Sequence, residues 1–276
     1  MTKKQKVFSI TIKSLIYLFT IFAFGVLVWI LGTVAFRGIP QLKPEMFSIN
    51  NTTQNLSMLP SIIHTIVIIL ISLAIAVPVG VFTAIYLVEY APKGSKFVKV
   101  VRMATETLQG IPSIVFGLFG YLFFVRALGF GYSQIAGALT LTIMILPLII
   151  RSTEEALIAV PVSLRMGSFA LGARKLRTIF QVVLPPAMNG IISGIILAIG
   201  RIFGETAALQ FTAGTFAKLA SPLNQGSTLA VFMYNLTAEG RHTQEAYASA
   251  LVLLIIAIII NAMSTKLANL IGGKNE

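Results

Sequence analysis

The segment from Pro60 to Val88 reads PSIIHTIVIILISLAIAVPVGVFTAIYLV and contains no Asp, Glu, Lys or Arg. It is longer than the roughly 20 mainly apolar residues that an α-helix needs to cross the hydrocarbon core of a bilayer. Inside that core every backbone N–H and C=O group must find a partner within the protein, and a helix achieves this. The segment is therefore predicted to be a membrane-spanning helix.

Apolar runs of similar character occur elsewhere along the chain. Together they predict an all-α polytopic membrane protein with about six transmembrane helices, at 15–36, 60–88, 110–128, 135–150, 187–209 and 246–270. The first run is longer than the apolar core of a signal peptide, so we expect it to be retained. We expect residues 1–14 to form a cytoplasmic N-terminus and residues 15–276 to form a single transmembrane domain.

The composition supports a membrane protein and excludes several kinds of site. Only 11% of the residues are charged and 56% are hydrophobic, whereas soluble domains carry about 25% charged residues. The absence of Cys excludes disulfides and thiolate catalysis, and two His residues are too few for a His-rich metal site. All nine acidic residues are Glu.

The basic residues indicate how the chain is oriented in the membrane. The net charge of +12 does not point to a nucleic-acid partner, because the Lys and Arg residues lie mainly in short loops between the apolar runs. If the N-terminus is cytoplasmic, most of the 21 Lys and Arg residues fall in cytoplasmic segments. This positive-inside pattern predicts that both termini are cytoplasmic.

The cytoplasmic segment at about 152–186 has a helical periodicity of its own. Between Val162 and Phe180, apolar residues at helical spacing alternate with basic ones. We expect one or two short helices that are broken near Gly172 and ended by Pro185 and Pro186. The residues alone leave two interpretations open: an amphipathic helix resting on anionic lipid headgroups, or a docking helix for a cytoplasmic partner.

Part of this segment resembles the EAA loop of bacterial ABC importer permeases. Residues 166–173 read MGSFALGA, and a Leu-Pro pair follows at 184–185. The glycine and the Leu-Pro pair match the motif, but Met-Gly-Ser stands where the family has Glu-Ala-Ala. The resemblance implies a cytoplasmic coupling helix that contacts an ATPase subunit, with the coupling residues Met166, Gly172, Arg174, Leu184 and Pro185.

Four further motifs narrow the resemblance. They are YLVEY at 86–90, GIPSIVFGLFG at 110–120, EEALIAVP at 154–161 and GRIFGETAALQFTA at 200–213. From about residue 59 onward the chain is similar to PstA-type permease subunits of phosphate-specific ABC importers. This resemblance implies a type I importer permease fold in the bacterial cytoplasmic membrane, which translocates inorganic phosphate.

The same resemblance implies partners. They are a PstC-like sister permease, a PstB-like ATPase dimer and an extracytoplasmic PstS-like phosphate-binding protein. The chain contains no Gly-x-x-x-x-Gly-Lys-[Ser/Thr] phosphate-binding loop. We therefore expect a non-enzymatic subunit that binds no cofactor itself, with ATP and Mg²⁺ held by the ATPase.

A pair of charges lies inside the predicted span at 187–209. Arg201 and Glu205 are four residues apart, so in a continuous helix they would share one face. Placing an Arg near the bilayer centre costs about 2.5–3.5 kcal/mol of insertion free energy, and such residues usually face the interior of a helix bundle or a water-filled path. A guanidinium group also matches the oxygens of phosphate.

We therefore expect Arg201 to contact translocating phosphate and Glu205 to hold Arg201 when the path is empty, with Thr206 as a further donor. The alternative is that Arg201 and Glu205 neutralise each other and fix helix packing. The Gly-x-x-x-Gly pairs at 190/194 and 200/204 predict close helix contacts.

Three other functions stay open on the sequence. The same architecture could serve another oxyanion, such as sulfate or molybdate. A stand-alone secondary carrier should show an internal repeat, and the two halves of the sequence show no convincing one. A structural scaffold would not need Arg201 and Glu205 inside a span.

Overall fold

The computed structural model describes residues 3–49, 56–92, 94–238, 240 and 242–272, and in these ranges the chain is helical without a β-strand. Five helices are long and apolar enough to span a membrane, or six if one bent pair counts as a span. The prediction of about six transmembrane helices is confirmed.

The elements are α1 (Lys3–Gly38), η1 (Ile39–Gln41), η2 (Pro44–Phe47), α2 (Leu59–Ile85), η3 (Tyr86–Tyr90), α3 (Lys96–Gln109), α4 (Ser113–Gly120), η4 (Tyr121–Ala127), α5 (Gln134–Ala159), α6 (Val162–Ala170), α7 (Lys175–Thr178), η5 (Ile179–Val183), α8 (Leu184–Phe203), α9 (Ala207–Thr212), α10 (Leu229–Ala238) and α11 (Thr243–Gly272).

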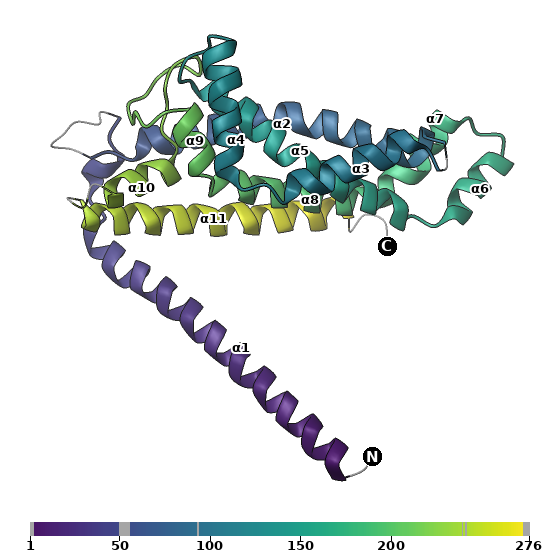
Figure 1. Cartoon of the computed structure of the whole chain (residues 1–276), viewed down its shortest axis with the longest axis horizontal. Helices are drawn as coiled ribbons and strands as arrows, with labels where there is room; N and C mark the ends of the chain where they lie inside the picture. The colour runs from purple at the N-terminus through teal and green to yellow at the C-terminus, as the bar shows by residue number, and fades with distance from the viewer. Residues whose placement is uncertain (1–2, 50–55, 93, 239, 241, 273–276) are drawn as a thin grey trace.

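Helix α5 lies at the centre of the bundle, between α2 and α8 (Figure 1). Leu141, Ile145 and Ile149 of α5 are fully buried in the main apolar core. A polar contact adds to this packing, because Ser72 Oγ of α2 donates a hydrogen bond to Ala138 O at 3.0 Å. Inside a bilayer, such interhelical hydrogen bonds and tight packing hold helices together.

Small residues bring α8 against α5. A Cβ atom at Gly190 would lie 2.6 Å from Ala156 Cβ, and Gly194 is similarly close to Ser152. The predicted close contact is therefore confirmed at 190/194. At 200/204 the prediction is wrong, because a Cβ atom at Gly200 would meet no atom of another helix.

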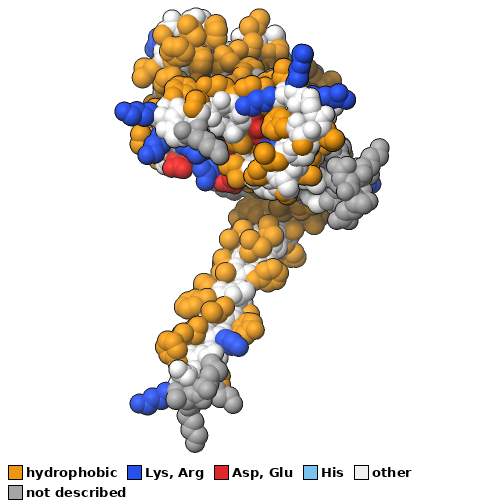
Figure 2. Space-filling model, turned by 90° about the vertical axis from the view of Figure 1, so that its right-hand side faces the viewer, with side chains coloured by type: hydrophobic (Ala, Val, Ile, Leu, Met, Phe, Trp, Pro, Cys, Tyr) orange, Lys and Arg blue, Asp and Glu red, His pale blue; other side chains and the backbone are white. Residues whose placement is uncertain are grey.

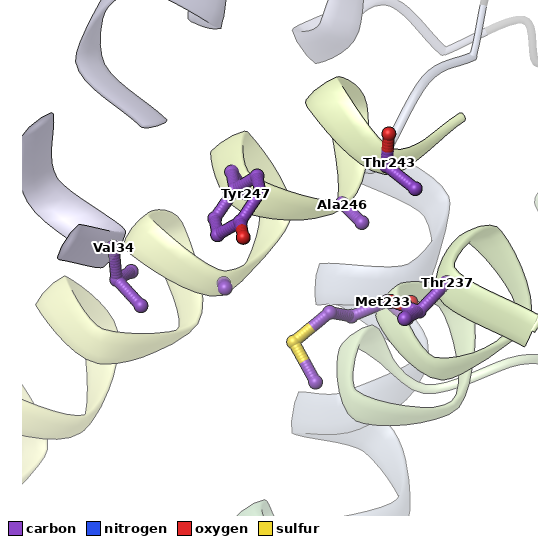
Figure 3. A pocket seen from close by; sticks show the side chains of 7 residues that line it. Val34, Met233, Thr237, Thr243, Ala246 and Tyr247 are labelled. Atoms are coloured by element: carbon purple, nitrogen blue, oxygen red, sulfur yellow. The ribbon is translucent and has the colours of Figure 1, made fainter. Parts of the chain in front are cut away.

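Helix α1 extends away from the bundle and meets it only near its C-terminal end (Figure 1). The most apolar stretch of α1 has no buried residue, and Trp29 is 73% exposed. Near the contact, Arg37 Nη1 donates a hydrogen bond to the Tyr247 hydroxyl of α11 at 3.2 Å, and the guanidinium lies over that ring. A small open pocket of about 220 Å³ lies there between α1, α10 and α11, and Val34, Met233 and Tyr247 are among its lining residues (Figure 3).

The third predicted span is a bent pair of helices. Helix α3 and the continuous α4–η4 helix meet at an angle of 104°. Pro112 lies at the bend, where its ring restricts the preceding residue and removes a backbone donor. The span predicted at 110–128 corresponds to the helix from Ser113 to Ala127, which follows α3 through this bend.

The fifth predicted span has different boundaries at both ends. Helices α7, η5 and α8 run continuously from Lys175 to Phe203, so Pro185 and Pro186 do not end a helix as expected. They lie just after the π-helical turn η5, where the regular i to i−4 hydrogen-bond pattern that a proline disrupts is already interrupted. At the other end, α8 stops at Phe203 and α9 starts at Ala207.

The N-terminal end of α1, the C-terminal end of α11 and the α6–α7 segment point to the same end of the molecule (Figure 1). Viewed from that end, Lys and Arg side chains lie around the bundle, while the visible side of α1 is mostly hydrophobic (Figure 2). This is the end that the positive-inside pattern assigns to the cytoplasm.

Candidate functional site

Arg201 lies in the last turn of α8 and lines an open cavity of about 750 Å³ between α5, α8 and α11. It is the one charged residue among those that line the cavity in the described part of the chain: Leu148, Ser193, Ile196, Leu197, Gly200, Arg201 and Asn261. Its side chain is half-buried. Within the described residues, its guanidinium makes no hydrogen bond or ion pair. A guanidinium has five N–H donors, so all of them remain available to a ligand.

Glu205 has a different role from the expected one. Because α8 ends at Phe203, the four-residue spacing no longer places Glu205 on the same helical face as Arg201. Glu205 Oε1 instead accepts a hydrogen bond from the Ala208 N–H at 3.0 Å. Glu205 therefore caps the N-terminus of α9, where a carboxylate is favourable. Neither the expected Arg201–Glu205 contact nor the alternative of mutual neutralisation is seen.

Thr206 lies at the N-cap position of α9 but does not cap that helix with its side chain. Its hydroxyl lies 3.5 Å from Gly204 O, a long hydrogen bond. Thr206 is half-buried and does not line the Arg201 cavity. The predicted set Arg201, Glu205 and Thr206 is thus divided between the end of α8 and the start of α9.

The structure adds two polar residues to the cavity that sequence reasoning missed. Ser193 lies two turns before Arg201 on α8, and its hydroxyl donates a hydrogen bond to Asn189 O at 2.8 Å. Asn261 comes from α11 and is exposed at the cavity. The available signal was the position of Asn261, a polar residue inside the last apolar run. An amide supplies both donors and acceptors to a polar ligand.

The cytoplasmic segment forms one short helix, α6, which is followed after a turn by the start of the long helix that runs from α7 through α8. Helix α6 ends at Ala170 and α7 begins at Lys175. Gly172, between them, has φ +81°, a conformation that favours glycine. The hydroxyl groups of Ser168 and Thr178 lie 2.8 Å apart and join the two helices. The break near Gly172 is therefore confirmed.

The predicted coupling residues fall into two groups. Met166 and Arg174 are exposed on the α6–α7 segment together with Gly172. Leu184 and Pro185 instead belong to the first turn of α8, and Leu184 packs against the apolar core there. A groove of about 540 Å³ runs along α6 and α7, and its lining includes Leu171, which is 90% exposed.

Comparison with known proteins places this geometry in a family. Residues 76–272 match the family described as "Binding-protein-dependent transport system inner membrane component". The chain is 36% identical over 266 residues to "Probable ABC transporter permease protein YqgI" of Bacillus subtilis, covering 90% of each chain. It is 34% identical to "Phosphate transport system permease protein PstA" of Haemophilus influenzae, covering 77% of this chain and 76% of that protein.

Solved structures agree on the fold. A bacterial alginate ABC transporter chain matches with a TM-score of 0.69 at 14% identity, covering 98% of this chain and 96% of that one. A chain of the MetNI methionine ABC transporter matches with a TM-score of 0.61 at 20% identity, covering 77% of this chain and 93% of that one. The chain therefore belongs to the binding-protein-dependent transport system inner membrane components and is a multi-pass membrane protein with the fold of type I ABC importer permeases.

Proposed function

We propose that this chain is the PstA-type permease subunit of an ABC importer that carries inorganic phosphate into the cytoplasm. The observation that carries the proposal is Arg201, which has no ion-pair partner among the described residues and is the one charge that they place in this cavity between membrane-spanning helices. An intramembrane charge without a protein partner is costly, so it marks a substrate path. The PstA names of the relatives indicate which anion uses the path.

The chemistry of the cavity suits a phosphate ion in passage. Arg201 offers paired N–H donors to two phosphate oxygens, and charge-assisted hydrogen bonds of this kind are strong. Ser193 and Asn261 add neutral groups from α8 and α11. A single cation, without further charged ligands around the anion, binds phosphate weakly enough to release it again, which transport requires. Glu205 supports this path by capping α9, and Thr206 lies at the start of the same helix.

The energy comes from a partner subunit. The chain binds no cofactor in this proposal, and ATP with Mg²⁺ is held by a PstB-like ATPase dimer in the cytoplasm. The exposed apolar side chains of Met166 and Leu171, with the basic Arg174, form the surface that docks on the ATPase. Gly172 allows the turn between α6 and α7. Leu184 and Pro185, in the first turn of α8, transmit the movement of the docking surface to the rest of that helix.

Two further partners complete the importer. A PstC-like sister permease covers the exposed face of α1 and closes the open side of the Arg201 cavity. A PstS-like phosphate-binding protein meets the extracytoplasmic end, which carries α9 and α10. The complex resides in the bacterial cytoplasmic membrane.

A permease for sulfate or molybdate is the second candidate, because the Arg201 guanidinium matches any tetrahedral oxyanion. The test is uptake of labelled phosphate at low micromolar concentration in cells that lack only this chain, with and without its restoration. We expect uptake to return with the chain and to resist excess unlabelled sulfate and molybdate. Unchanged phosphate uptake would reject the substrate, and competition by sulfate or molybdate would favour the second candidate.

A further inference from the structure

Arg165 joins three elements at the cytoplasmic end of the bundle. It belongs to α6, and its Nη1 and Nη2 donate hydrogen bonds to Val160 O at 2.6 Å and Leu157 O at 2.7 Å. These carbonyls lie at the C-terminal end of α5, where a helix leaves its last carbonyl groups without helical partners. The same guanidinium donates through Nε to Glu89 Oε1 of η3 at 3.0 Å, and Nη2 lies 2.9 Å from that oxygen.

The Arg165–Glu89 pair is shielded from water. The Arg165 side chain is 14% exposed and the Glu89 side chain 9% exposed, whereas the pair of Arg151 and Glu155 is 42% and 63% exposed. Exposed ion pairs contribute little to stability. Removing one partner of a shielded pair leaves an uncompensated buried charge, which strongly lowers the stability of the folded protein.

This contact attaches α6 to α5 and η3. Helix α6 has no buried side chain, so apolar packing does not fix its position. It is flanked by Pro161 and by the turn at Gly172. A second contact supports the same junction from α7, because Lys175 Nζ lies 4.7 Å from the centre of the Tyr90 ring of η3. Polar contacts thus attach α6 to α5 and η3, and the Ser168 hydroxyl of α6 also contacts Thr178 of α7, which continues into α8.

We propose that Arg165 is a positioning residue that makes α6, the end of α5 and the end of the α2 span move as one body. When the ATPase displaces α6, the movement passes through Glu89 to α2 and through the α5 carbonyls to α5. Helix α5 contacts α8 at Ser152 and Gly194, and α8 carries Arg201. The inference rests on the proposed function, because it assumes that an ATPase docks on α6.

The first test measures a distance between α6 and α2, so its result does not depend on which anion is transported. The chain has no Cys, so spin labels can be placed at introduced Cys residues, Ala170→Cys on α6 and Val79→Cys on α2, in the purified complex with its ATPase. We expect one narrow distance distribution in the wild type and a broad one in Arg165→Gln. The matched control is Arg151→Gln, which removes an exposed arginine from the same end of the bundle and should leave the distribution narrow.

The second test is the number of phosphate ions imported per ATP hydrolysed in proteoliposomes. We expect Arg165→Gln to lower this ratio by roughly 2- to 30-fold, the range found for residues that carry coupling, while the ATPase stays bound. A role limited to folding would lower the amount of complex and leave the ratio unchanged. The double variant Arg165→Gln/Glu89→Gln carries no unpaired charge, so it assembles where the single variant is too unstable.

The results of these two tests distinguish the role of Arg165 from the proposed phosphate substrate. A narrow distance distribution in Arg165→Gln and in the double variant, or an unchanged ratio of import to hydrolysis, overturns the role of Arg165. If the wild-type complex hydrolyses ATP but imports no phosphate, the proposed substrate is wrong. The distance measurement then still decides whether Arg165 holds α6 to α5 and α2.

Discussion

Gly194 of α8 and Ser152 of α5 are in direct contact, and a methyl group at Gly194 would lie 2.5 Å from Ser152 Cβ. No side chain fits at this position without separating the helices. We expect Gly194→Val to lower the stability of the assembled protein by about 1–3 kcal/mol, the usual cost of overpacking. Thermal unfolding in detergent measures the change.

The matched control for this packing prediction is Gly200→Ala, six residues later on the same helix. A Cβ atom there meets nothing within 4 Å, and Ala favours a helix by up to about 1 kcal/mol over Gly. We expect Gly200→Ala to unfold at the wild-type temperature or above it. Equal destabilisation by both variants would show that the α5–α8 contact is not tight.

Replacement of Arg201 should reduce phosphate uptake. Arg201→Gln removes the charge from the cavity, and loss of a charged hydrogen bond of about 1.5–3 kcal/mol corresponds to a roughly 10- to 150-fold lower rate. Arg201→Lys should retain part of the uptake, because it keeps the charge but not the paired donors. Initial rates of labelled-phosphate uptake, normalised to the assembled complex, measure both effects.

Arg126→Gln is the control for Arg201. Arg126 is exposed, and its guanidinium contacts the Tyr121 side chain, outside the cavity. Its replacement should leave uptake near the wild-type rate. Wild-type uptake by assembled Arg201→Gln complexes would exclude Arg201 from the path.

The observed cap on α9 and a direct action of the Glu205 charge on the passing anion predict different uptake results for Glu205→Gln. If Glu205 caps α9, the amide oxygen of Gln still accepts the Ala208 hydrogen bond, and stability is nearly kept. Glu205→Ala should then cost about 0.5–2 kcal/mol. If the negative charge acts on the passing anion, Glu205→Gln alters the concentration dependence of uptake without changing stability. Thermal unfolding and uptake curves, measured in parallel for both variants, decide between the two roles of Glu205.

The turn at Gly172 should tolerate Asn better than a β-branched residue. A non-glycine residue at φ +81° costs about 1–2 kcal/mol, and Asn adopts this conformation more readily than most. Gly172→Val should therefore reduce both the stability of the α6–α7 segment and ATP-driven uptake more than Gly172→Asn. Protease sensitivity of the segment and uptake rates measure the two effects. Equal behaviour of the variants would show that the left-handed turn is not required.

Leu171 tests the docking surface without disturbing the fold, because its side chain is 90% exposed. We expect Leu171→Asp to leave the thermal stability of the permease unchanged and to weaken capture of the ATPase in a pull-down. Leu223→Asp is a control with a 71% exposed leucine in the segment between α9 and α10. Undiminished ATPase capture by Leu171→Asp would remove Leu171 from the docking surface.

The sequence predicted the spans well where the apolar pattern is continuous. The run at 60–88 became α2 with η3, and the contact at 190/194 was confirmed, because close helix approach needs small residues. The sequence did not reveal where a span breaks. Gly204 reads as a packing glycine in the sequence, but it ends α8, and this moved Glu205 from the Arg201 face to the cap of α9.

The candidate site was predictable only in part. Arg201 stood out because a charge inside an apolar run is costly. Asn261 reaches the same cavity from α11, and only the tertiary arrangement of α8 and α11 brings them together. The attachment of Arg165 to Glu89 could not be predicted either, because 75 residues of chain separate the two and only the tertiary fold brings α6 to η3.

The two breaks in the spans occur in helices that touch each other. Helix α4 follows the bend at Pro112 and α9 follows the break after Phe203, and a Cβ atom at Gly117 of α4 would lie 2.8 Å from Ala208 Cα of α9. Because α4 and α9 touch through their backbones at this point, a displacement of one short helix carries the other with it, and the connecting residues that absorb it are 110–112 and 204–206, outside α5 and α8. The long helices then keep their internal hydrogen bonds, so no unpaired backbone group of theirs is exposed to lipid.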